Sequence, residues 1–138
     1  MKSNLRVSLL RLLLAGAGAG WAISVIGVFL PWSVATEWLE QMGGSGPIPN
    51  DPMANYWLRM AAGAFTSVGV LFLLCAWQPR KFARVIPILA ILSLAEGIVL
   101  LAYGLLLDLA LFPFVADVAI CIVPGVGVLL LRHALDRE

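Results

Sequence analysis

Four long apolar runs constrain the fold of this chain more than any other feature. They cover about residues 9–30, 57–77, 85–107 and 114–131, and each is close to the roughly 20 residues that a helix needs to cross a bilayer. Only 12% of the 138 residues are charged and the mean hydropathy is +0.98, whereas soluble domains are about 25% charged. The sequence therefore predicts an all-α membrane protein, a single domain formed by an antiparallel four-helix transmembrane bundle.

The first apolar run has basic residues ahead of it, as a secretory signal peptide does. Arg11 interrupts the start of the run, however, and the apolar stretch continues to Leu30, beyond the length of a usual signal peptide. We therefore expect an uncleaved span that ends at Pro31.

Small residues along the first two spans predict close contacts between helices. In the first span they are Gly16, Gly20, Ser24 and Gly27. In the second span Ala62, Thr66 and Gly69 share one face, with Gly63 and Ser67 beside it.

The segment between these spans is too polar to cross a bilayer. Apolar residues recur at helical spacing over residues 33–43, at Val34, Trp38 and Met42, and acidic residues occupy the other side. This pattern predicts a short amphipathic helix in the membrane interface, followed by a proline-rich, extended connector over residues 47–55.

Charge is distributed unevenly over the connections between spans. Eight of the nine basic residues lie in the N-terminal segment, in the turn at residues 78–84 and in the C-terminal tail. With four spans these segments share one side, and the positive-inside rule predicts that this side, with both termini, is cytoplasmic.

Glu96 lies near the middle of the third run, where a carboxylate is most costly. Ser93 and Tyr103 share its face of the helix at three- and four-residue spacings, so we expect this face to point into the bundle. Thr66 and Ser67 of the second span are expected near the same depth as hydrogen-bond partners. Because no Lys or Arg is expected at that depth, Glu96 is predicted to be neutral.

Two interpretations of Glu96 remain open. In one, it is a protonation site or a ligand-binding carboxyl group in an internal cavity. In the other, it is a protonated acid that holds helices together or faces a partner subunit.

A second polar set is expected at the opposite rim. Arg59 lies about one turn inside the second span, level with Asp108 and Asp117 near the ends of the third and fourth spans. An ion pair there would compensate the arginine charge. The alternative is a polar entrance to a ligand cavity.

No catalytic signature is present. The sequence has no HExxH, no CxxC, no paired histidines and no glycine-rich phosphate loop. We therefore expect no enzymatic activity, no metal and no cofactor. The net charge of +1 gives no reason to expect nucleic acid as a partner.

Three segments resemble a group of small four-span bacterial membrane proteins that includes BphX-like proteins. They are Tyr56-Trp57-Leu58-Arg59, Gln78-Pro79-Arg80-Lys81 and Glu96-Gly97. The resemblance implies a four-helix bundle and supplies no reaction. Together with the short loops, it predicts a multi-pass protein of the bacterial inner membrane.

These observations lead to three functional hypotheses. The first is a non-catalytic membrane protein that binds a lipid-like or small apolar ligand, or a membrane partner, in a groove beside Glu96 and Tyr103. The second is a proton-coupled carrier of small molecules that uses Glu96 as the coupling site and is expected to be a homo-oligomer. The third is a structural accessory subunit of a larger membrane complex. Membrane lipids are expected partners in every case.

Overall fold

The computed structural model describes residues 2–43, 47–48, 50–109 and 111–132, and this part of the chain is all-α. Its helices are α1 (Lys2–Ala22), α2 (Val25–Phe29), α3 (Trp32–Gly43), α4 (Pro52–Trp77), α5 (Ile86–Leu106) and α6 (Leu111–Leu131). Four segments are long and apolar enough to cross a membrane: Leu5–Phe29, Pro52–Trp77, Ile86–Leu106 and Phe114–Leu131. The predicted all-α four-helix fold is confirmed, and these segments indicate a multi-pass membrane protein.

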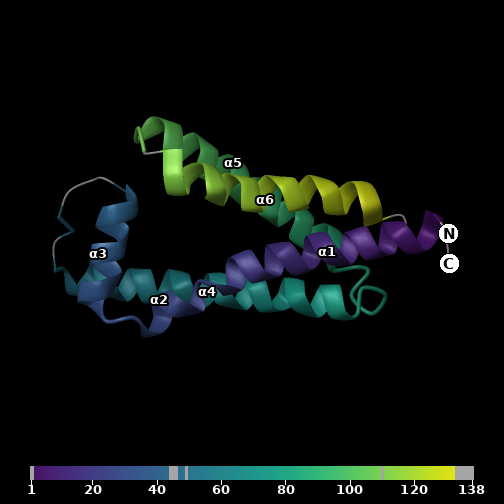
Figure 1. Ribbon diagram of the computed structural model, residues 1–138, viewed down its shortest axis with the longest axis horizontal. Helices are drawn as coiled ribbons and strands as arrows, with labels where there is room; N and C mark the ends of the chain where they lie inside the picture. Colours follow the sequence, from purple (N-terminus) through teal and green to yellow (C-terminus); the bar gives the residue numbers. More distant parts are fainter. Residues whose placement is uncertain (1, 44–46, 49, 110, 133–138) are drawn as a thin grey trace.

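The spans form two antiparallel pairs (Figure 1). α1 packs along α4, and α5 packs along α6; α1 also contacts α6, whereas α4 and α5 touch little. The pairs lie close together where α1 begins, and they diverge toward the end that carries α3. The bundle is therefore closed at one end and open between the pairs at the other.

The closed end carries every basic residue that the structure describes except Arg59 of α4, and we call it the basic end. It contains the start of α1, the turn at residues 78–85 and the end of α6. The largest buried core cluster belongs to this half of the bundle. Its members are Leu10, Leu14, Ala17, Phe72, Cys75, Ile86, Leu89, Ala90 and Val128.

Backbone contact between glycines joins α1 to α4. A Cβ atom added to Gly69 would lie 2.8 Å from Ala22 Cα and 2.8 Å from the Gly18 carbonyl oxygen. The predicted α4 face is correct at Ala62 and Gly69, which are both buried. On α1 the predicted stripe does not form one contact face, because Gly16 has open space around it.

Glycines also join α5 to α6. A Cβ atom on Gly97 would meet Ile122 at 2.7 Å, and one on Gly125 would meet Leu94 at 2.8 Å. At Gly104 the added atom would fall within the Phe114 ring. In both pairs, the helices can therefore approach each other this closely only because these positions are glycines without a side chain.

Helix ends differ from the sequence-based boundaries in two places. The first span is interrupted after Ala22, and backbone hydrogen bonds at Ser24 and Gly27 reach back three residues. α4 begins at Pro52, earlier than the expected start at Tyr56 or Trp57. The Asp51 carboxylate accepts a 3.0 Å hydrogen bond from the Met53 amide and so caps the helix there.

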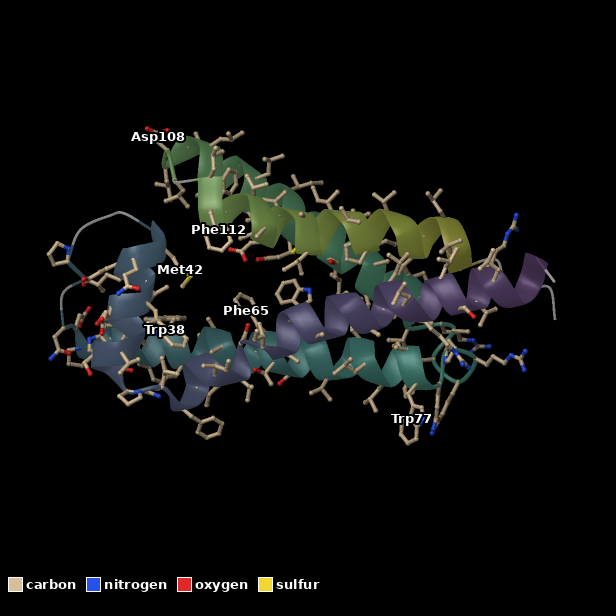
Figure 2. The ribbon with its side chains drawn as sticks, viewed as in Figure 1. Trp38, Met42, Phe65, Trp77, Asp108 and Phe112 are labelled. Carbon is tan, nitrogen blue, oxygen red and sulfur yellow. The ribbon has the colours of Figure 1, made fainter. Side chains whose placement is uncertain are left out.

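α6 continues through Pro124 and Gly125, although a proline inside a helix often causes a kink. Its non-helical backbone angles occur at Phe112, near its start. α3 covers the segment predicted as an amphipathic helix, and it contacts α6 across the open end. Figure 2 shows Met42 of α3, Phe65 of α4 and Phe112 of α6 directed toward the space between the two pairs.

The connector contains the residues that the structure leaves undescribed between α3 and α4. The predicted extended segment at residues 47–55 is only partly described, since residue 49 is not, and its second half belongs to α4. Arg137 of the expected basic tail also lies outside the described residues.

Candidate functional site

Glu96 lines a groove between α4 and α5. The groove has a volume of about 380 Å³. α4 contributes Phe65 and Val68, and Trp21 of α1 closes the groove from behind. The groove exists because α4 and α5 separate beyond the core at the basic end.

The lining of this groove is almost entirely apolar, and the groove opens sideways. Leu92 and Val99 line it and remain 60% and 47% exposed. In a spanning helix such exposed apolar side chains face lipid. Access to Glu96 along this route is therefore from the bilayer.

The Glu96 carboxyl group has no hydrogen-bond partner among the described residues. The hydroxyl groups expected to bind it serve their own helix instead. Thr66 Oγ1 donates to the Ala62 carbonyl oxygen at 2.7 Å, and Ser67 Oγ donates to the Gly63 carbonyl oxygen at 2.9 Å. Neither Thr66 nor Ser67 lines the groove.

Ser93 and Tyr103, expected beside Glu96, point in different directions. Ser93 is buried and donates a 3.0 Å hydrogen bond to the carbonyl oxygen of Cys121 in α6, although it also borders the groove. Tyr103 is 60% exposed and does not line the groove. The buried face of α5 follows Ser93, Gly97 and Gly104, and this face is turned toward α6.

Asp117 is not among the hydrogen-bond partners of Arg59 in the described part of the chain. It lines a second cavity of about 210 Å³, together with Leu100, one turn along α5 from Glu96. The two acidic side chains therefore line two cavities that share Trp21 and Phe65.

Trp21 and Phe65 line both cavities and stand between them. Their rings pack edge to face with centroids 5.1 Å apart. The Trp21 indole nitrogen is buried and has no hydrogen-bond partner in the described part of the chain. A buried donor without an acceptor is costly, so this nitrogen is suited to an acceptor on a bound molecule.

Trp21 was not identified from the sequence. It lies in the middle of the first apolar run and away from its ends, where tryptophan usually marks an interface. A tryptophan at that depth needs a partner for its N–H group, and this requirement is the signal that could have revealed it.

Arg59 is held by the backbone of the first span. Its guanidinium group donates to the carbonyl oxygens of Val28 and Leu30, the latter at 3.0 Å, and to Asn55 Oδ1 at 2.8 Å. The expected ion pairs with Asp108 and Asp117 are not formed among the described residues. The carbonyl groups at the end of a helix carry partial negative charge, so they substitute for a carboxylate.

Asp108 has a different role from the one expected. It is exposed and has a positive φ of 49°, just after α5 ends. The amide groups of Asp108 and Leu109 donate to the carbonyl oxygens of Leu105 and Gly104. This is a Schellman-type helix end, and Asp is one of the few non-glycine residues that adopts it readily.

Within the described residues, no group of three His, Cys, Asp or Glu side chains is placed to hold a metal ion. The chemistry available beside the groove is two carboxyl groups, one indole N–H group and two aromatic rings. No family model, curated protein or solved structure matches the chain.

Proposed function

We propose that this protein is a non-catalytic membrane protein that binds a lipid-like or small apolar molecule in the groove between α4 and α5. The observation that carries the proposal is the apolar groove of about 380 Å³ that opens toward lipid and contains the unpartnered Glu96 carboxyl group. Ligand sites in proteins commonly enclose about 300–1,000 Å³ and combine apolar walls with a few polar groups.

The arrangement of the groove favours a molecule with an apolar chain and one hydrogen-bond donor. The chain would lie against Phe65, Val68 and Leu92, which all line the groove. The donor would satisfy Glu96, which has no partner within the described chain. A long-chain alcohol meets both requirements.

A filled-groove variant tests this proposal. Val68→Trp places a large side chain in the groove, and Val70→Trp is the matched control because Val70 is exposed on the same helix and does not line the groove. The purified protein in nanodiscs would be photolabelled with a long-chain alcohol that carries a diazirine. We expect labelled peptides from α4 and α5 in the native chain and in Val70→Trp, and several-fold less labelling in Val68→Trp. Equal labelling of all three proteins would reject the groove as the binding site.

A second candidate function is a proton-coupled carrier that uses Glu96. It is supported by the two carboxyl groups, Glu96 and Asp117, that line cavities sharing Trp21 and Phe65, because intramembrane carboxyl groups often belong to proton relays. The test is movement of a lipophilic cation such as ethidium in proteoliposomes under a pH gradient. Transport that is lost in Glu96→Gln would support the carrier, and transport unchanged by that substitution would reject it.

For location, we propose a bacterial inner membrane with the basic end in the cytoplasm. The support is the excess of Lys and Arg at that end and the positive-inside rule. Single cysteines introduced at Ser8 and Asp51, in a chain without Cys75 and Cys121, would report the orientation. Labelling of intact cells by an impermeant maleimide is expected at position 51 and not at position 8; the reverse pattern would invert the topology.

A further inference from the structure

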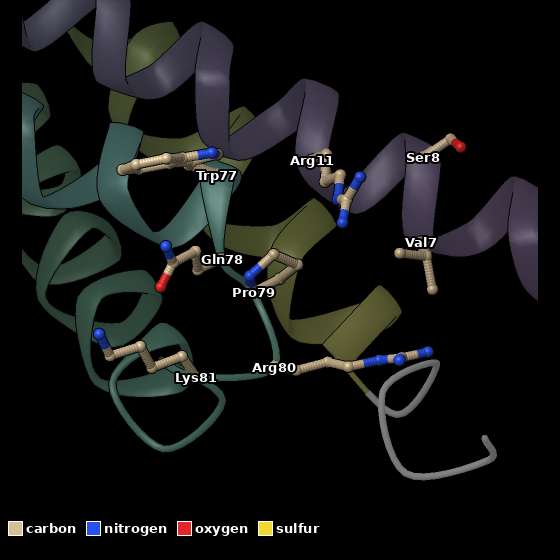
Figure 3. A pocket seen from close by; sticks show the side chains of 8 residues that line it. All are labelled: Val7, Ser8, Arg11, Trp77, Gln78, Pro79, Arg80 and Lys81. Carbon is tan, nitrogen blue, oxygen red and sulfur yellow. The ribbon is translucent and has the colours of Figure 1, made fainter.

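A third cavity lies at the basic end, away from the groove. It has a volume of about 570 Å³. α1 and the segment that follows α4 form its walls, as Figure 3 shows. Its lining residues are Val7, Ser8, Arg11, Trp77, Gln78, Pro79, Arg80 and Lys81.

The lining of this basic cavity is strongly cationic. Arg11 comes from α1, whereas Arg80 and Lys81 come from the turn, so two separate segments bring positive charge to one cavity. None of the described lining residues is acidic. Arg80 already has an interaction partner, so Arg11 and Lys81 are the cations considered for binding an anion in this cavity.

The position of the cavity matches the head-group layer of a bilayer. Trp77 is the last residue of α4 and is 73% exposed, as expected for an aromatic side chain at the membrane interface. In Figure 3, Arg11 extends from α1 toward Pro79 in the turn. Trp77 and Val7 add apolar surface beside these polar groups.

We propose that the basic cavity binds the head group of an anionic phospholipid. A guanidinium group binds phosphate oxygens through paired N–H donors, which suits Arg11, and Lys81 supplies a compact positive charge. The Ser8 hydroxyl and the Gln78 amide offer further donors. Basic pockets between transmembrane helices are suited to anionic lipids, and Trp77 lies where the upper part of an acyl chain would pass.

This proposal is independent of the groove between α4 and α5. It concerns a different ligand class at a different depth, and it stands whether or not an apolar molecule binds beside Glu96.

Lipid retention measured by native mass spectrometry tests the proposal. The full chain would be equilibrated in micelles with phosphatidylglycerol or, separately, with phosphatidylcholine of the same acyl chains. We expect preferential retention of phosphatidylglycerol, weakened about fivefold in Arg11→Gln and about fivefold in Lys81→Gln, since each basic residue near an anionic surface contributes about that factor.

Arg84→Gln is the matched control. Arg84 is exposed and belongs to the same end of the bundle, but it does not line the cavity. We expect this variant to retain phosphatidylglycerol as the native chain does. An equal loss in Arg84→Gln would indicate unspecific attraction and overturn the proposal, as would equal retention of the two lipids by the native chain.

A competition measurement separates binding of the lipid from binding of free phosphate. Inorganic phosphate added at millimolar concentration is expected to leave the lipid bound, because the lipid also contacts Trp77 and Val7. Displacement of the lipid would mean that the cavity binds free phosphate and would overturn the lipid assignment.

If Arg11→Gln does not fold, Lys81→Gln decides the comparison alone. Lys81 is an exposed turn residue, and its substitution removes one of the two charges on which the proposal depends.

Discussion

The Ser93 hydroxyl group of α5 donates a 3.0 Å hydrogen bond to the carbonyl oxygen of Cys121 in α6. This bond fixes the register of the two helices one turn from Glu96. It also places Asp117, one turn before Cys121, beside the second cavity. The positions of both carboxyl groups therefore depend on how α5 and α6 are aligned.

Removal of this bond is expected to have a small effect on stability. Hydrogen bonds between membrane helices contribute about 0.6 kcal/mol on average and up to about 1.7 kcal/mol, so Ser93→Ala should lower the free energy of unfolding by an amount in that range. The loss would be measured by titration with SDS in mixed micelles, followed by circular dichroism. Ser67→Ala is the control, because the exposed Ser67 hydroxyl bonds only within its own helix. A larger loss in Ser67→Ala than in Ser93→Ala would contradict the assignment.

The contact between α1 and α4 should not tolerate a methyl group at Gly69. Alanine there would bring Cβ within 2.8 Å of Ala22 Cα and the Gly18 carbonyl oxygen, and overpacking of this kind costs about 1–3 kcal/mol. The same SDS titration is expected to show this loss for Gly69→Ala. Gly63→Ala tests the same change on the same helix, where a Cβ atom would have no neighbour within 4 Å, and it should cost nothing. Equal midpoints for the two variants would show that the helices do not approach at Gly69.

Arg59 should stabilise the end of the first span and should act independently of the aspartates. Hydrogen bonds to charged groups contribute about 1.5–3 kcal/mol, so Arg59→Gln is expected to destabilise the protein and to speed hydrogen exchange around residues 25–34. In a double-mutant cycle with Asp108→Asn, the two effects should add within about 0.5 kcal/mol, as for residues without contact. A coupling energy well above this value would indicate that Arg59 and Asp108 form an ion pair at the rim and would contradict this prediction.

The stability of the protein should depend on the backbone conformation that residue 108 can adopt and not on the charge of its side chain. Its positive φ favours glycine and asparagine, whereas a left-handed conformation costs most other residues about 1–2 kcal/mol. We expect Asp108→Gly and Asp108→Asn to keep the native unfolding midpoint and Asp108→Val to lower it. A loss in Asp108→Asn comparable to that in Asp108→Val would point to a role for the carboxylate instead.

Hydropathy and helical periodicity predicted the spans and the amphipathic segment because both signals are local in the sequence. The sequence also identified Glu96 as the unusual residue of its span, because a carboxyl group is costly in the middle of an apolar run, but it did not show that the groove beside Glu96 opens toward lipid. The buried positions of Ala62 and Gly69 followed from the small residues on one face of the second span.

The contact partners of these residues could not be predicted from the sequence. Spacing shows which residues share a face, but it does not show which helix covers that face. Ser93 meets α6 and not Thr66, because the glycines at positions 97 and 104 bring α5 and α6 together. The backbone partners of Arg59 were equally hidden, because every residue has a carbonyl group and only the fold shows which ones are left free.

The glycine contacts have a consequence for biogenesis. Those within α1–α4 and within α5–α6 join spans that follow one another during synthesis, so each helical hairpin can complete its internal contacts as soon as its second helix has entered the membrane. The contacts between hairpins run through Gly20 against Ile120 and Gly127 against Leu13, and both require α6, which is made after α1, α4 and α5. Each hairpin can therefore form its own glycine contacts first, and the α1–α6 contacts can form only once α6 has been inserted.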